Sequence, residues 1–442
     1  MKKVIQPWFV TSFLTSKSLK PITATTILCL MSACNFTSRS ASEKSLKIGA
    51  LLPLTGEISA YGIPMQKTAK LLVDTVNQCE GVLGSPVTLV NADDQSEPQI
   101  GAEAMSRLVQ VDRVSAVIGG AGSATSAASV DIAVRNQVVM ISPSSTSPTF
   151  TERAKKGDFK GFWYRTAPPD TFQAPAIAQL AYQNNYKRIA ILGVNNDYGK
   201  GLIDAFIPAF EKKGGQVLNK ANLALYALNA SNFDSEVRNA FGKNPDAVLL
   251  IDYSQTGGQV LKSSYEQGFL EKIPVILSDG LKDAKLAERV GKKADGQLAL
   301  STAASLIGTV PSSRGPAFSA FRTRYQQAFS NQEPSIYDPN TWDAAAIIVL
   351  ATELAKSTKG EAIRDQIPQV SNPAGEKVSD VCQALSLIRQ GKKIDYEGAS
   401  SSVNFDAQGD VQGSYNVWTI AKDGTIQIKG NIQADRFDSA KP

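Results

Sequence analysis

Two short stretches rich in glycine and hydroxyl residues carry the groups best suited to bind a small molecule. The first, Gly119–Ser123, leads into a predicted helix, and the second, Ser142–Ser147, follows an apolar run. Glycine lets a ligand approach the backbone, and N–H groups at a helix start are free to bind an anion. Because neither stretch contains a lysine or arginine, both predict a site for a small carboxylate rather than for a polyphosphate.

The segments that flank these turns must position them. Val114–Ile118 and Val138–Ile141 are short and mostly apolar, as is typical of buried parallel strands. Ala124–Arg135 between them has the length and alanine content of a crossover helix. Both turns therefore leave the carboxyl ends of neighbouring strands, where open α/β sheets hold ligands.

The same alternation of strands and helices covers most of the chain. The first block predicts strands at 46–53 and 87–91 and helices at 63–77 and 102–109. After a boundary at 151–170, a second block predicts helices at 172–183 and 198–213, strands at 188–194 and 216–224, and further alternating segments to 290. A third block predicts helices at 317–329, 341–355 and 361–367, then a hairpin-like region at 403–405 and 414–428. Two such α/β blocks predict parallel sheets covered on both faces.

The composition restricts the chemistry. The chain has 442 residues, 43% hydrophobic and 20% charged, which is ordinary for a globular protein with more than one core. It contains no histidine, which excludes histidine-based triads, imidazole bases and histidine metal sites. Its four cysteines show no CxxC spacing, and no nucleotide-binding or nucleophile-elbow motif is complete. No cofactor, metal ion or enzymatic activity is predicted.

The net charge gives no reason to expect a nucleic-acid partner. Residues 1–33 contain four lysines and no acidic residue, so the remaining chain carries 42 − 41 = +1 instead of the formal +5. Nucleic-acid binding requires a strongly basic surface. No nucleic-acid partner is therefore predicted.

The first 33 residues are typical of an export signal, with a basic start, an apolar segment at 22–31 and small residues before a cysteine. Met31-Ser-Ala-Cys34 resembles a bacterial lipobox, which implies that Cys34 carries a lipid and that the protein is periplasmic and membrane-anchored. The alternative is a transmembrane anchor, but the apolar segment contains three threonines and is short for the ~30 Å hydrocarbon core. The serine-rich segment 34–45 is predicted to be a tether.

Export changes the interpretation of the other cysteines. With Cys29 removed and Cys34 acylated, Cys79 and Cys382 remain in an oxidising compartment. Two interpretations stay open, a disulfide between them or two unrelated thiols, because a bridge requires a Cα separation that the sequence does not give.

Five motifs in order resemble the leucine/isoleucine/valine-binding protein family, the type I periplasmic solute-binding proteins of amino-acid importers. They are Ile48–Gly56, Ile141–Pro148, Tyr164–Asp170, Asp197–Gly201 and Val403–Asp410. The resemblance implies two doubly wound parallel-sheet lobes joined by a three-strand hinge, with an amino acid bound between them. It places the first lobe at 46–167 and 301–409 and the second at 168–300 and 410–442.

The resemblance also implies roles for individual residues. The carboxylate contacts carry over to Ser123, Ser144 and Thr146, whose alternative role is ordinary turn and cap chemistry. Asp170 and Asp279 match the family's acceptors for the ligand ammonium, although Asp170 is also placed to cap a helix and Asp279 to form a strand-end turn. Tyr61, Tyr198 and Tyr253 match cleft-facing aromatic positions, with packing as their alternative role.

These inferences predict a monomeric, exported substrate-binding protein of an ABC importer that closes over a neutral or branched-chain amino acid and then contacts a membrane permease. The alternatives are a binding protein for urea, an amide or another small carboxylate, and a ligand-sensing module. The paired aspartates favour a ligand with an α-ammonium group.

Overall fold

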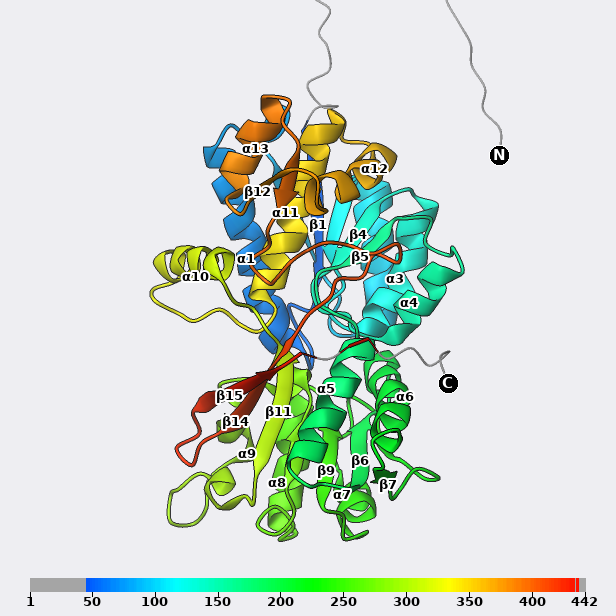
Figure 1. Ribbon diagram of the computed structural model, residues 1–442, viewed down its shortest axis with the longest axis vertical. Coiled ribbons are helices and arrows are strands. Elements are labelled where there is room, and N and C mark those ends of the chain that lie inside the picture. The colour runs from blue at the N-terminus through cyan, green and yellow to red at the C-terminus, as the bar shows by residue number, and fades with distance from the viewer. Residues whose placement is uncertain (1–44, 434, 437–442) are drawn as a thin grey trace, which may run out of the picture. The chain divides into compact units, whose positions relative to one another are not determined.

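The computed structural model describes residues 45–433 and 435–436, which fold around two β-sheets with helices against their faces (Figure 1). We call each sheet with its helices a lobe. The prediction of two α/β lobes built on parallel strands is confirmed. The export signal, the lipidation site Cys34 and residues 34–44 of the tether lie outside the described residues. Within the described part of the chain, no helix has the length and apolarity needed to span a membrane.

The first lobe is built on a five-stranded sheet of order β2-β1-β3-β4-β5, in which all strands are parallel. Its strands are β1 (Lys47–Leu52), β2 (Thr88–Asp93), β3 (Ala116–Gly119), β4 (Val139–Ser142) and β5 (Trp163–Arg165). The helices that connect them are α1 (Ser59–Gln78), α2 (Pro98–Arg107) with a π-helical extension (Leu108–Asp112), α3 (Ser123–Arg135) and α4 (Pro148–Lys155). Because side chains alternate along a strand, Ile118 packs on the α1 side of the sheet and Val117 on the α2 and α3 side.

The second lobe is built on a larger sheet of order β15-β14-β11-β10-β9-β6-β7, with β8 also paired to β6. Its strands are β6 (Arg188–Val194), β7 (Gln216–Val217), β8 (Ala224–Tyr226), β9 (Ala247–Ile251), β10 (Val275–Leu277), β11 (Leu306–Pro311), β14 (Tyr415–Ile420) and β15 (Ile426–Ile432). Its helices are α5 (Asp170–Gln183), α6 (Asp197–Glu211), α7 (Asp234–Phe241), α8 (Ser254–Glu266), α9 (Leu286–Val290) and the 3-10 turns at Asp279–Leu281 and Ala299–Thr302. The pairs are parallel except β11–β14 and β14–β15.

The third block of the chain returns to the first lobe. It forms α10 (Pro316–Ala328), α11 (Asp338–Ala355), α12 (Gly360–Ser371), β12 (Glu376–Val378), α13 (Val381–Arg389) and β13 (Ile394–Tyr396). Helix α11 packs between α1 and α12, and β12 pairs with β13 apart from both large sheets. Cys79, directly after α1, and Cys382 in α13 form a disulfide with their Cα atoms 5.8 Å apart.

The chain passes between the lobes three times, at 166–169, 312–315 and 410–414. The exact lobe boundaries stay a prediction, but one strand lies in the other lobe from the one that those boundaries assign to it. β11 was expected in the first lobe, within 301–409, but pairs with β10 in the second sheet. The return to the first lobe therefore follows Pro311.

Two predicted strands are wrong, and in both places an asparagine side chain replaces strand pairing. The predicted strand at 216–224 is two short strands, because Asn219 between them accepts from the Ile191 N–H at 2.9 Å and donates to the Ile191 carbonyl at 2.8 Å. Residues 403–405 form no strand, because Asn372 binds both the N–H and the carbonyl of Phe405. The hairpin is formed by β14 and β15 alone, and Asp423 stabilises its turn.

Candidate ligand-binding site

A small cavity lies where the strand ends of the two lobes meet. Its free space is about 20 Å³, roughly what one water molecule requires, because side chains from both lobes close over it. The lining residues come from α1, the turns after β3, β4, β9 and β10, helix α6 and the residue before α11. They are Ile58, Tyr61, Met65, Ala121, Ser123, Ser144, Tyr198, Tyr253, Asp279, Gly280 and Tyr337.

The structure brings six of the eight predicted binding residues to this cavity. They are Tyr61, Ser123, Ser144, Tyr198, Tyr253 and Asp279. Thr146 and Asp170 do not line it but are fully buried close by, and the Asp170 N–H donates to the Thr146 carbonyl at 2.8 Å. Asp279 is also close enough for its charge to raise the pKa of Asp170.

The turn after β4 is held in place by its own hydroxyl groups. The Ser142 hydroxyl donates to the Gly120 carbonyl at 2.7 Å, and the hydroxyls of Ser126 and Ser145 form a hydrogen bond of 2.7 Å with each other, each 3.1 Å from the same carbonyl. Ser144 donates to the Ala121 carbonyl at 2.9 Å, so this hydroxyl proton, which we expected to reach a ligand, is engaged within the protein. These bonds join the turns after β3 and β4 into one rigid unit.

Other groups in the same two turns remain available to a ligand. The Thr146 hydroxyl is buried without a partner, and its N–H has none among the described residues either. Ser123 begins α3, and its hydroxyl oxygen accepts a hydrogen bond from the Ser147 N–H at 3.3 Å. The hydroxyl proton of Ser123 takes no part in that bond and can be donated to a ligand. Unpaired buried donors are costly and rare in native proteins. This part of the site can therefore accept an anionic group without a protein cation.

Asp170, the first residue of α5, is buried beside the cavity without lining it. Its carboxylate is buried, and neither oxygen has a hydrogen-bond partner within the described residues. Burial raises the pKa of Asp170 well above the usual value, and the charge of Asp279 adds to this effect. The nearby Thr146 hydroxyl and the charge of Arg165 lower the pKa in part, although neither group forms a hydrogen bond of good geometry with the Asp170 carboxyl. A buried carboxylate with no donor lacks its natural complement, which is a cation.

Asp279, in contrast, is well supplied with donors. It accepts from Gln173 Nε2 at 3.0 Å, from the Tyr198 hydroxyl at 2.6 Å and from the Tyr337 hydroxyl. Burial, then the charge of Asp279, raises the pKa of Tyr198 well above its usual value, so this tyrosine remains a donor. The Tyr337 contact joins the lobes, because Asp279 follows β10 and Tyr337 precedes α11.

Two residues of this network were missed by the sequence analysis. Gln173 lies one helical turn after Asp170 in α5, and the i, i+3 spacing would have placed both on the same helix face. Tyr337 carries no such signal, because its partner Asp279 is 58 residues away and on a different sheet.

The remaining wall of the cavity is apolar and aromatic. Ile58, Met65 and Tyr61 come from the first lobe, and the Tyr61 hydroxyl donates to the Gly280 carbonyl of the second lobe at 2.6 Å. Tyr253 packs beside Tyr198 with ring centroids 5.2 Å apart. Such a wall suits an aliphatic group.

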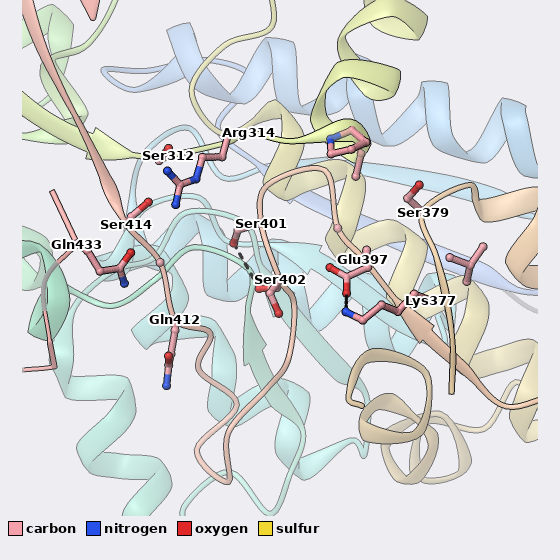
Figure 2. A pocket seen from close by; sticks show the side chains of 15 residues that line it. Ser312, Arg314, Lys377, Ser379, Glu397, Ser401, Ser402, Gln412, Ser414 and Gln433 are labelled. Atoms are coloured by element: carbon pink, nitrogen blue, oxygen red, sulfur yellow. Dashed lines mark hydrogen bonds and ion pairs between the residues drawn. The ribbon is translucent and has the colours of Figure 1, made fainter. Parts of the chain in front are cut away.

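A larger cavity of about 620 Å³ lies elsewhere, between the start of α10, the ends of β12 and β13 and the crossings at 312–315 and 410–414. Figure 2 shows its polar side chains, including the Lys377–Glu397 ion pair and Arg314 near Ser312. It contains none of the predicted binding residues. The described residues also contain no cluster of acidic or cysteine side chains suited to a metal ion. Our candidate is therefore the smaller cavity, because it contains six of the predicted binding residues and lies beside the unsatisfied polar groups of Thr146 and Asp170.

Comparison with known proteins agrees with this fold. The chain is 26% identical over 375 residues to the chemotactic signal transduction system substrate-binding protein BasB of Halobacterium salinarum, which covers 81% of this chain and 83% of that protein. The crystal structure of leucine binding protein LivK from Thermotoga maritima has a TM-score of 0.73 at 27% identity, over 88% of this chain and 99% of LivK.

A third protein shares the fold alone. A solute binding protein of an ABC transporter from Rhodopseudomonas palustris, in complex with benzoate, has a TM-score of 0.71 at 17% identity, over 90% of this chain and 98% of that one. The family model described as periplasmic binding protein matches residues 45–395. Members of this family are substrate-binding proteins rather than enzymes, and their type I fold is the one described above. The chain belongs to the periplasmic binding protein family.

Proposed function

We propose that this protein binds a neutral, branched-chain α-amino acid between its lobes and delivers it to an ABC permease. The observation that carries the proposal is the pairing of opposite unsatisfied groups. The buried Asp170 carboxylate lacks a donor, and the adjacent Thr146 N–H and hydroxyl lack acceptors among the described residues. An α-amino acid carries an ammonium and a carboxylate on one carbon atom, so it satisfies both at once.

The carboxylate of the ligand is proposed to bind the first lobe. Its partners are the Thr146 N–H and hydroxyl, the Ser123 hydroxyl and the free N–H groups at the start of α3. The positive end of the α3 dipole and these neutral donors stabilise an anion without a lysine or arginine. Ser144 is proposed to contribute through its position in the turn, because its hydroxyl proton is engaged by Ala121.

The ammonium of the ligand is proposed to bind Asp170 and Asp279. Asp170 supplies two free acceptor oxygens, whereas Asp279 is oriented by Tyr198, Tyr337 and Gln173. A cation between the two carboxylates also removes their mutual repulsion, which favours the ionised form of Asp170.

The side chain of the ligand is proposed to contact Ile58, Tyr61, Met65 and Tyr253. Their apolar surfaces favour leucine, isoleucine or valine, in agreement with the description of LivK as a leucine binding protein. The hydrogen bonds from Tyr61 to Gly280 and from Tyr337 to Asp279 join the lobes, so the ligand enters when they break and is enclosed when they re-form.

The same proposal includes export through the signal at 1–33 and a lipid anchor on Cys34. It also includes a monomeric state and a permease partner. A second candidate ligand is a carboxylate without an ammonium, as in the benzoate complex of the related fold. Such a ligand, or urea, leaves the buried Asp170 without a cation. A ligand-sensing role, as the name of BasB describes for that protein, uses the same ligand site.

The test is isothermal titration calorimetry of the purified protein with matched ligands. L-leucine, L-isoleucine and L-valine are compared with isovalerate, which lacks the ammonium, with L-leucinamide, which lacks the carboxylate, and with benzoate and urea. We expect at least one of the three amino acids to bind and isovalerate and leucinamide to bind at least 100-fold more weakly. Tighter binding of isovalerate, benzoate or urea than of all three amino acids contradicts the proposal.

A further inference from the structure

Arg165, which the proposed function does not use, connects the carboxylate-binding turn to the hinge. It is the last residue of β5, immediately before the first crossing between the lobes, and its side chain is completely buried. Its guanidinium donates from Nη1 to the carbonyls of Ser145 at 3.0 Å and Ser147 at 2.9 Å. It also donates from Nε to Asp410 at 2.7 Å, at the start of the third crossing. One side chain therefore joins its own strand β5 to the turn after β4 and to the third crossing.

The contact with the Ser145 carbonyl has a direct effect on the ligand site. In a trans peptide the carbonyl of one residue and the N–H of the next point in opposite directions. When Arg165 holds the Ser145 carbonyl, the N–H of Thr146 must point away from Arg165. This is the N–H that has no partner among the described residues and that the proposed function assigns to the ligand carboxylate.

The charge of Arg165 is balanced without involving the ligand. Asp410, which is 1% exposed, pairs with Arg165 and also accepts from Thr151 Oγ1 at 2.6 Å and from Arg436 Nη2 at 2.7 Å. Thr151 in turn accepts from Arg165 Nη2 at 2.7 Å. Burying an ion pair is costly unless its hydrogen bonds are nearly complete, as they are here. A cluster of this kind specifies one geometry of the turn.

We infer that Arg165 is a positioning residue for ligand binding: it orients the turn at 145–147 as a carboxylate receptor, and Asp410 links that orientation to the hinge. The inference rests on the proposed function, because it assigns a task to the same turn. Arg165 does not touch the ligand. Its contribution is that the turn is already in its binding geometry before the ligand arrives.

The experiment compares two arginine-to-lysine variants of the full chain. Lysine keeps the positive charge but cannot make the planar set of hydrogen bonds, so Arg165→Lys tests the geometry and not the charge. The matched control is Arg389→Lys in α13. Arg389 also joins a carboxylate, Glu353, to two carbonyls, Cys79 and Gly81, but outside the ligand cavity.

Affinities for L-leucine and L-leucinamide are measured by calorimetry for both variants and the wild type. We expect Arg165→Lys to raise the Kd for leucine at least 10-fold and to reduce the preference for leucine over leucinamide at least 5-fold. Arg389→Lys should change both by less than 2-fold. Equal effects of the two variants on this preference overturn the inference while leaving leucine binding by the wild type, and hence the proposed function, intact.

Hydrogen exchange of the ligand-free protein gives a readout that does not depend on the ligand. The amides of residues 144–147, 149 and 150 should exchange at least 10-fold faster in Arg165→Lys than in Arg389→Lys. If Arg165→Lys does not fold, Asp410→Asn replaces it, because it leaves the guanidinium in place but removes its counter-charge and one acceptor. Unchanged exchange in the variant that folds overturns the inference. If the wild type binds none of the tested amino acids, the proposed function fails, and exchange alone decides whether Arg165 orders the turn.

Discussion

Two aspartates of this protein are equally buried, yet their surroundings differ completely. Asp343 in α11 accepts from the Ala399 N–H at 2.7 Å and from the N–H and hydroxyl of Ser400 at 2.7 and 2.6 Å. Asp170 in α5 accepts no hydrogen bond from any described residue. The hydrogen bonds of Asp343 come from its own lobe and stabilise the loop at 399–400. Asp170 has no donor within the described part of the protein, and in our proposal the ligand supplies one. Burial alone therefore does not distinguish the two aspartates, whereas the absence of a donor to either Asp170 oxygen among the described residues does.

The comparison is tested most strongly by Asp170→Ala. We expect the affinity for L-leucine to fall by about 2–5 kcal/mol, because the buried ligand ammonium loses its partner. The stability of the ligand-free protein should not fall, since the substitution removes a carboxylate that has no donor. Calorimetry and thermal unfolding measure the two effects. An unchanged affinity would remove Asp170 from the site.

Asp343→Ala should give the opposite result. It leaves the buried N–H groups of Ala399 and Ser400 without an acceptor, so the free energy of unfolding should fall by about 1–3 kcal/mol. The Kd for leucine of the folded variant should stay within 2-fold of the wild-type value. Denaturant unfolding and calorimetry check this prediction. A large loss of affinity without loss of stability would mean that Asp343 also serves the site.

The pH dependence should separate the two aspartates again. Burial raises the pKa of Asp343 to about 7, above the unfolded value near 4, so its contribution to stability is complete below pH 4 and is lost as the pH rises to 7. Asp343→Asn should reduce the fall in melting temperature over this range. It should not change how leucine affinity depends on pH.

Asp170, whose pKa burial and Asp279 raise, should instead control ligand affinity. The ammonium requires the ionised carboxylate, so affinity should weaken by up to tenfold per unit as the pH falls below the raised pKa of Asp170. Calorimetry between pH 4 and 8 measures this dependence, and a flat profile with a conserved Kd would contradict it.

The smallest expected effect is that of Tyr337→Phe. It removes one of the three donors to Asp279 but leaves Tyr198 and Gln173, so leucine affinity should fall by about 0.5–1.5 kcal/mol. Because this hydroxyl also joins the lobes, the loss should appear mainly as faster ligand dissociation in stopped-flow measurements. Tyr182→Phe, on the exposed face of α5, serves as the control.

The sequence predicted those parts of the site that follow from local patterns. The two donor-rich turns were predicted because glycine- and serine-rich stretches follow apolar strands, and parallel strand ends meet at one edge of a sheet. The roles of Ser123 and Thr146 within those turns came from the resemblance to a family. Asp170 and Asp279 came from the resemblance to a family and not from spacing. The alternation of strand and helix patterns predicted the parallel α/β sheets, and the resemblance implied their arrangement as two lobes.

What the sequence could not predict depends on contacts between distant segments. Tyr337 reaches Asp279 from another lobe, and β11 joins the second sheet because it pairs with β10, not because of its composition. The side chain of Asn219 binds the backbone of Ile191 and so interrupts the predicted strand, an effect that strand propensity does not predict. The engagement of the Ser144 proton by Ala121 likewise depends on how close two turns lie.

The disulfide between Cys79 and Cys382 spans 303 positions of the sequence and so encloses the whole central part of the second lobe. A protease that cuts once anywhere between the two cysteines opens the polypeptide but leaves its two pieces covalently joined. Without a reducing agent the nicked protein therefore migrates as one chain on a denaturing gel, and with one it separates in two. In an environment that contains proteases, the disulfide therefore keeps the two fragments of a cleaved molecule covalently linked, so that the lobes are not separated.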